Sequence, residues 1–124
     1  MQNNYKELKN KEDEAIWIGK VIESLMNKQE SEKLAKQGDV KNDHLANVGN
    51  AKLRFLLWLI ENKDDLPASH AAIQAKHKIQ MLNSKEKVGD ITITRTLTYL
   101  KKDFIVRVDW DDMIPPRYKL VLPK

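Results

Sequence analysis

The side chains best suited to chemistry in this sequence lie between residues 93 and 104, where hydroxyl, cationic and aromatic groups recur at helical spacing. On a helix, one apolar stripe with intervals of four, three and four residues would consist of Ile93, Leu97, Leu100 and Phe104. The opposite side would carry hydrogen-bond donors, positive charge and one aromatic ring, on Arg95, Thr98, Tyr99 and Lys102. Contact with base edges and phosphates in a DNA groove requires such groups. The spacing therefore predicts a DNA-contacting helix.

The same segment also fits an extended strand. Threonines at 92, 94, 96 and 98 alternate with other side chains in a period-two pattern, and threonine and isoleucine both favour strands. As a strand, the segment would join a three-stranded meander and present no recognition surface. We favour the helix because the apolar stripe reaches Leu100 and Phe104 only with helical spacing. In addition, Lys101 and Lys102 would place positive charge at the C-terminal end of a helix, where its dipole favours cations.

Motifs in this region resemble the recognition helix and first wing strand of winged helix-turn-helix DNA-binding proteins. They are Ile93-Thr94-Arg95, Leu97, Leu100-Lys101-Lys102, Phe104-Ile105 and Arg107-Val108, and residues 117–122 resemble the returning wing strand. The match covers about a quarter of the chain and extends loosely over residues 42–124. Family members usually have glycine where the helix ends, whereas this chain has Asp103, a residue that adopts a left-handed backbone at comparatively low cost.

The resemblance implies a division of the contacts with DNA. Thr94, Arg95, Thr98 and Tyr99 would face the major groove, where an arginine can hold both acceptors of a guanine. The expected phosphate contacts flank the helix or lie on the wing strands, and they are Lys85, Lys87, Thr92, Lys101, Lys102, Arg107, Arg117 and Lys119. The implied partner is double-stranded DNA. The implied function is sequence-specific binding by a transcriptional regulator or by a replication or partition accessory protein.

The charge distribution is consistent with a polyanionic partner. The 124 residues carry a formal net charge of +4, and residues 68–107 alone hold eight Lys or Arg against three Asp or Glu. Positive charge is thus concentrated around the expected DNA-contacting helix. A lysine-rich solvated surface would have a similar composition, so the charge is consistent with DNA binding but does not distinguish it from an ordinary surface.

Other classes of function find little support in the sequence. The absence of cysteine excludes disulfides, thiol nucleophiles and cysteine-based zinc sites. The histidines lack the spacing of a metal site, so we expect surface or phosphate-facing roles for them and no metal or cofactor; they are His44, His70 and His77. No catalytic motif is present, and we do not expect an enzyme. The longest apolar run, residues 55–60, is too short to cross a membrane, and no secretory signal precedes it, which predicts a cytoplasmic location.

An acidic cluster precedes the Pro-Pro turn between the two expected wing strands. Asp109, Asp111 and Asp112 lie on either side of Trp110. Phosphates would repel this wing tip, so we expect it to contact a protein, or to leave DNA contact to the cations of the wing strands. The cluster favours an alternative function from another class, a winged-helix adaptor that binds proteins without reading DNA.

Four helices and a hairpin should position these groups. We expect helices over residues 12–37, from an Asp43 cap to Lys63, from Pro67 to Leu82, and after an Asp90 cap. The side chains expected to face inward on the second helix are Leu45, Val48, Leu53, Leu56, Leu57 and Ile60, with Phe55 and Trp58 adding bulk. Those expected to face inward on the third helix are Ile73, Ala75, Ile79 and Leu82.

The predicted fold is mainly α with a small β-hairpin, that is, α+β: a winged helix-turn-helix with an N-terminal helical extension. Residues 1–39 would form a frayed tail and an amphipathic helix, and residues 40–124 the winged-helix domain. The apolar side of the first helix would cover the core of its own domain or pair with a second copy. The residues predicted for such a homodimer are Ile18, Val21, Ile22 and Leu25.

Overall fold

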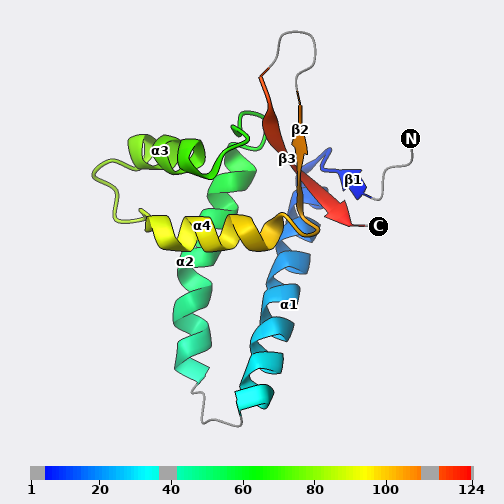
Figure 1. Ribbon diagram of the computed structural model, residues 1–124, viewed down its shortest axis with the longest axis vertical. Helices are drawn as coiled ribbons and strands as arrows, with labels where there is room; N and C mark the ends of the chain where they lie inside the picture. Colours follow the sequence, from blue (N-terminus) through cyan, green and yellow to red (C-terminus); the bar gives the residue numbers. More distant parts are fainter. Residues whose placement is uncertain (1–4, 37–41, 110–114, 124) are drawn as a thin grey trace.

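The computed structural model describes residues 5–36, 42–109 and 115–123, and the side chains in these ranges outside 28–36 and 42–49. The described chain forms four helices and a small antiparallel sheet, with one strand before the helices and two after them (Figure 1). Their order is β1 (Tyr5–Glu7), α1 (Lys11–Lys36), α2 (Asn42–Glu61), α3 (His70–Gln80), α4 (Asp90–Leu100), β2 (Ile105–Val108) and β3 (Arg117–Pro123). The predicted mainly helical α+β class is confirmed.

The threonine-rich segment is a helix, so the strand alternative is wrong. α4 buries Ile93, Leu97 and Leu100 completely, and Phe104 is buried just beyond its end. These aliphatic side chains face the core only when the backbone is helical, and their burial outweighs the strand propensity of the threonines. The N-cap is Gly89, in an extended conformation and without a side-chain hydrogen bond. Asp90, predicted as the cap, instead occupies the first turn, where its charge favours the helix dipole.

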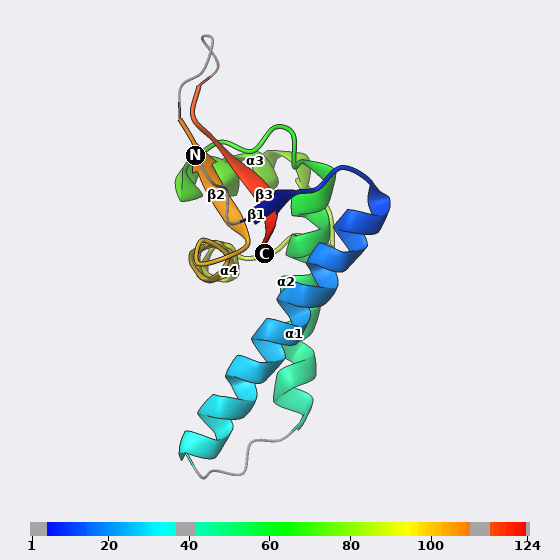
Figure 2. The same cartoon turned by 90° about the vertical axis from the view of Figure 1, so that its right-hand side faces the viewer.

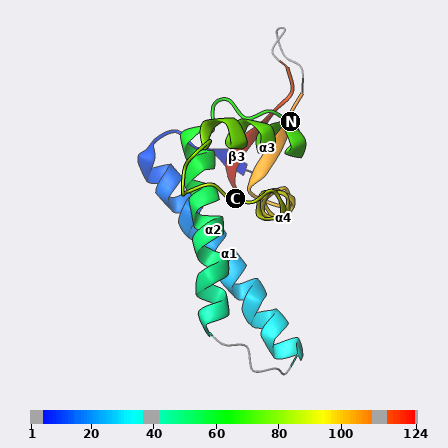
Figure 3. The same ribbon diagram turned by 90° about the vertical axis from the view of Figure 1, so that its left-hand side faces the viewer.

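α1 and α2 lie side by side and run in opposite directions, and the end of α1 and the start of α2 project away from the other elements in all three views (Figures 1, 2 and 3). The other end of this helical pair supports the core. Trp17 of α1 is fully buried, donates its indole N–H to the carbonyl of Phe104 (3.1 Å) and meets the Phe104 ring edge-on. The residues of α2 buried beside it are Phe55, Leu56, Trp58 and Leu59.

Parts of the predicted second helix differ from the structure. α2 begins at Asn42, so Asp43 lies inside it, and it ends at Glu61 rather than near Lys63. Leu53 and Leu57, predicted to face inward, are exposed, because the side of α2 that joins the core cluster is the one that carries Leu56 and Leu59. Ile60 packs against the core as predicted. Leu45 and Val48 lie among the side chains that are not described, and the predicted stop at Gly38-Asp39 lies outside the described residues.

α3 is shorter than predicted and turns a different side to the core. It starts at His70 after Ser69, whose hydroxyl accepts the amide N–H of Ala72. Pro67 is not in the helix; it pairs as an isolated bridge with Arg117, and the Tyr118 amide donates to the Leu66 carbonyl (3.0 Å). Ile73 is buried as predicted. Three residues predicted to face inward are instead exposed: Ala75, Ile79 and Leu82.

The sheet has three strands where the sequence predicted a hairpin of two. β3 lies in the centre and pairs antiparallel with β2 on one edge and with β1 on the other. β1 falls in the segment predicted to be frayed; its register joins Tyr5 to Pro123 and Glu7 to Val121. Three residues without an apolar alternation carry no strand signal, so β1 is specified by its partner strand rather than by local propensity. β2 follows α4 after a turn over residues 101–104.

Candidate functional site

The outer side of α4 is the best candidate for a functional surface. Figures 2 and 3 look along α4 and show one side of it free of other elements. Arg95 and Thr98, both predicted to read bases, are exposed, and Thr94 is half-buried at the edge of this side. The opposite side is buried on Ile93, Leu97 and Leu100. A helix anchored by its inner side can present its outer side at a fixed angle to a large partner.

Gln74 of α3 joins the two helices at the start of this surface. Its side-chain amide nitrogen donates to the backbone carbonyl of Asp90 (3.2 Å) and to the hydroxyl oxygen of Thr94. Since both acceptors belong to the first two turns of α4, Gln74 fixes where that end of α4 lies on α3. Gln74 carries no sequence signal of this role, because helical periodicity does not show which group on another helix a single glutamine reaches.

His77 holds the connection that leads into α4. The prediction of a surface or phosphate-facing histidine is wrong here, since His77 is 1% exposed and its Nε2 accepts the backbone N–H of Val88 (3.0 Å). The rings of Phe55 and Trp58 meet the imidazole edge-on, at 6.0 and 5.1 Å between centroids. Burial lowers the pKa of His77, Lys87 lowers it further, and Asp90 acts in the opposite direction. The neutral imidazole therefore ties α3 to the residue just before Gly89, the cap of α4.

His70 is half-buried rather than a surface residue, with its ring 6.3 Å from the ring of Tyr118. Burial lowers its pKa, and the charge of Lys101 adds to this effect. The side chain of His44 is not described. No group of His, Asp or Glu able to hold a metal ion occurs among the described residues.

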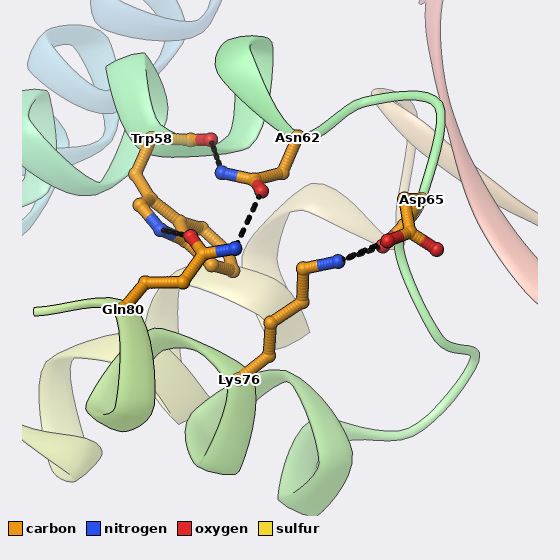
Figure 4. A network of polar contacts seen from close by, with 5 residues as sticks. All are labelled: Trp58, Asn62, Asp65, Lys76 and Gln80. Carbon is orange, nitrogen blue, oxygen red and sulfur yellow. Dashed lines mark hydrogen bonds and ion pairs between the residues drawn. The ribbon is translucent and has the colours of Figure 1, made fainter.

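A polar network at the end of α2 positions α3 (Figure 4). The indole N–H of Trp58 donates to Gln80 Oε1 (2.8 Å), Gln80 Nε2 donates to Asn62 Oδ1 (3.2 Å), and Asn62 Nδ2 donates back to the Trp58 carbonyl (2.8 Å). Lys76 adds an ion pair with Asp65 in the loop that follows α2. Through Gln74 and His77, this arrangement also determines where α4 begins.

Tyr99, predicted to read bases, lies elsewhere. Its side chain is half-buried, packs against the core, and makes a hydroxyl-to-hydroxyl hydrogen bond with Ser24 of α1. The helical position of Tyr99 borders the exposed side, but the length of the side chain lets it reach α1. The Lys102 ammonium lies 5.8 Å from the ring centroid. The structure thus brings Arg95, Thr98 and the edge residue Thr94 together, and it places Tyr99 between α4 and α1.

Cations lie near both ends of α4, as predicted. Lys85 and Lys87 are exposed on the connection that precedes the helix, and Lys101 and Lys102 are exposed immediately after it. The Lys101 ammonium lies 5.9 Å from the ring of Tyr118. Thr92, the remaining predicted phosphate contact in this region, is half-buried. A polyanion lying along α4 would therefore meet positive charge at each end of the helix.

The predicted phosphate contacts on the strands are less available. Arg107 pairs with Asp109 (2.9 Å), but both side chains remain exposed. Lys119 is bound to Glu7 of β1 (2.6 Å), a hydrogen bond that is the main cause of the lowered pKa of Glu7. Arg117 is half-buried. Asp111 and Asp112 of the expected acidic wing tip lie outside the described residues.

The four residues predicted for a homodimer are used inside the chain. Val21 is 0% exposed, and the other three pack partly buried against the same core: Ile18, Ile22 and Leu25. In this conformation they cover their own domain, which was the other role that the sequence allowed for the first helix. No helix in the described part of the chain is long and apolar enough to span a bilayer.

Comparisons with protein-family models, with curated proteins and with solved structures found no match to this chain.

Proposed function

We propose that this chain is a winged-helix protein that binds double-stranded DNA in a sequence-dependent manner, with α4 in the major groove. The observation that carries the proposal is the division of α4 into two sides. One side is buried on three aliphatic residues, and the other presents Arg95 and Thr98 to solvent. The major groove admits an α-helix, and its base edges offer acceptors and donors to such side chains.

Two further features support the proposal. The order of three helices followed by an antiparallel hairpin, α2, α3, α4, β2 and β3, is the order expected from the winged-helix resemblance. In addition, exposed lysines flank α4, so phosphates on either side of the groove would meet positive charge.

The roles follow from exposure and existing partners. Arg95 is the main base-reading residue because its exposed guanidinium can donate two parallel hydrogen bonds to guanine. Thr98 adds a hydroxyl contact on the exposed side, and Thr94 adds one at its edge. The proposed phosphate contacts are the exposed Lys85, Lys87, Lys101, Lys102 and Arg107, together with the half-buried Thr92. Tyr99 has a structural role between α4 and α1.

The test begins with selection of bound duplexes from a random pool, followed by titration of one selected duplex at several salt concentrations. Arg95→Ala should lose about 1–3 kcal/mol on the selected sequence and relax the preference at one position. Lys102→Ala should weaken binding to all sequences alike and reduce the salt slope by about one.

Lys11→Ala is the matched control, because Lys11 is an exposed cation and the first residue of α1, and the start of α1 lies across the molecule from α4 (Figure 2). It should leave the affinity and the salt slope unchanged. If Arg95→Ala binds the selected and random duplexes with the same preference as the unmodified chain, the assignment of α4 to the groove is wrong.

An adaptor function remains the second candidate, and one observation favours it. Leu53 and Leu57 are exposed one turn apart on α2, and exposed apolar residues at this spacing suit contact with another helix. Heparin chromatography separates the two candidates. A DNA-binding chain should be retained at low salt and leave as salt rises, whereas an adaptor without a phosphate-binding surface should elute early.

A further inference from the structure

A shallow hollow lies at the start of the exposed side of α4. It has a volume of about 250 Å³, and its lining residues come from α3 and α4: Gln74, Asp90, Ile91, Thr94 and Arg95. Ile91 is 69% exposed, although large aliphatic side chains usually lie inside. Ile91 carries no signal of a role in the sequence, since it is neither part of the apolar stripe nor a polar residue.

The lining suits the edges of bases better than phosphates. A phosphate site would gather cations and amide donors that are free to bind. In this hollow the Gln74 amide already donates to Asp90 and Thr94, and the guanidinium of Arg95 lies beside the carboxylate of Asp90 and the aliphatic surface of Ile91. Major-groove base edges present the matching groups, which are the acceptors of guanine, the amino groups of cytosine and adenine, and the methyl group of thymine. Isoleucine has a favourable contact only with the last of these.

The spacing on α4 sets the distance between two such contacts. Ile91 and Arg95 are four residues apart and therefore lie on the same side of the helix, about 6 Å apart along its axis. Successive base pairs rise by about 3.4 Å, so the two side chains reach base pairs that are one or two steps apart. Gln74 holds this end of α4 in place through its hydrogen bonds to Asp90 and Thr94.

We propose that Ile91 is a specificity-determining residue that contacts the C5-methyl group of a thymine one or two base pairs from the guanine held by Arg95. This inference rests on the proposed DNA-binding function and deepens it, because it states part of the recognised sequence. The hollow receives the methyl group, and Asp90 beside it disfavours the approach of a phosphate.

The experiment replaces each thymine of the selected duplex in turn by deoxyuridine, which removes the methyl group and leaves the base pair intact. Binding of the full chain is measured by fluorescence anisotropy. One replacement should weaken binding by about fourfold, the factor that corresponds to one lost methyl contact. That thymine should lie within two base pairs of the guanine whose contribution Arg95→Ala removes.

Two variants assign this effect to Ile91. Ile91→Ala should bind the thymine and deoxyuridine duplexes equally, because the contact that distinguishes them is gone. Ile79→Ala is the matched control, since Ile79 is also an isoleucine, is 75% exposed, and lies on α3 outside the hollow. It should keep the fourfold difference. Both side chains are exposed, so neither variant removes part of the core.

Results that contradict the role of Ile91 can be distinguished from results that contradict DNA binding itself. If no thymine is sensitive to replacement, or if Ile91→Ala keeps the same sensitivity as the unmodified chain, the role of Ile91 is overturned while DNA binding through α4 stands. If the chain shows no salt-dependent binding to any duplex, both the role of Ile91 and the proposed function are overturned.

Discussion

α3 and α4 each span 11 residues and are hydrogen-bonded to each other, but different chemistry holds them in the molecule. α4 is anchored by three fully buried aliphatic side chains. α3 buries one isoleucine and a histidine, and that histidine contributes a single acceptor for the Val88 amide. The position of α4 should thus be maintained mainly by apolar burial, whereas the position of α3 also depends on a neutral imidazole.

The largest effect should come from removing an aliphatic anchor of α4. Leu97→Ala should lower the free energy of unfolding by about 2–5 kcal/mol, because it removes transfer energy and leaves a cavity. The same substitution after α3, Leu82→Ala, should change stability by less than about 0.5 kcal/mol, since Leu82 is exposed. Urea unfolding followed by tryptophan fluorescence measures both. Equal losses would show that burial of Leu97 does not anchor α4.

A smaller effect should follow from removing the acceptor in α3. His77→Leu replaces the imidazole by an apolar side chain of similar size and leaves the Val88 amide without its acceptor. This should lower the free energy of unfolding by about 1–3 kcal/mol. Hydrogen exchange of the Val88 amide should accelerate in the variant. Unchanged protection of that amide would contradict the anchoring role of His77.

The pH dependence of stability should reflect the same histidine. Burial lowers the pKa of folded His77 and His70 below the ordinary value of 6.5, so the unfolded chain binds more protons in this range. Their contribution is fully present above pH 6.5 and is lost as the pH falls toward the lower folded pKa values. Urea midpoints between about pH 7.5 and pH 5.5 should therefore decrease, and His77→Leu should show a shallower decrease. A midpoint independent of pH in the unmodified chain would rule this out.

The smallest effect should come from Tyr99, at the border between the two sides of α4. Tyr99→Phe removes only the hydroxyl that bonds Ser24 and should cost about 0.5–1.5 kcal/mol in stability. Because the ring packs against the core, sequence preference on DNA should stay unchanged. If Tyr99→Phe changed the sequence preference on DNA and left the free energy of unfolding unchanged, Tyr99 would have to contact bases in the groove.

The sequence predicted α4 better than α3 for a physical reason. Apolar residues at intervals of four, three and four leave one arrangement that buries them all, so periodicity identifies the inner side of α4. In α3 the isoleucine at 79 resembles an inward residue, yet the buried position is taken by His77. That choice depends on the Val88 amide and on the rings of Phe55 and Trp58, which come from other parts of the chain.

For the candidate surface, too, helical periodicity predicted which residues are exposed but not which contacts they make with other helices. Exposure of Arg95, Thr98 and the flanking lysines follows from the helical pattern. The helical pattern could not show that Tyr99 reaches Ser24 or that Gln74 binds Thr94, because these contacts depend on how α1 and α3 lie beside α4. The strand β1 was missed for a similar reason, since its pairing partner is more than a hundred residues away.

The pairing of β1 with β3 has a consequence for how the chain is made. Glu7 meets Lys119, 112 positions later, and Trp17 donates to Phe104, 87 positions later. During synthesis, Trp17 and Glu7 can make these two contacts only after residues 104 and 119 have left the ribosome. Such distant contacts carry a large loop-closure cost. The sheet should therefore close late, and β1 stays without its partner strand until β3 has been made.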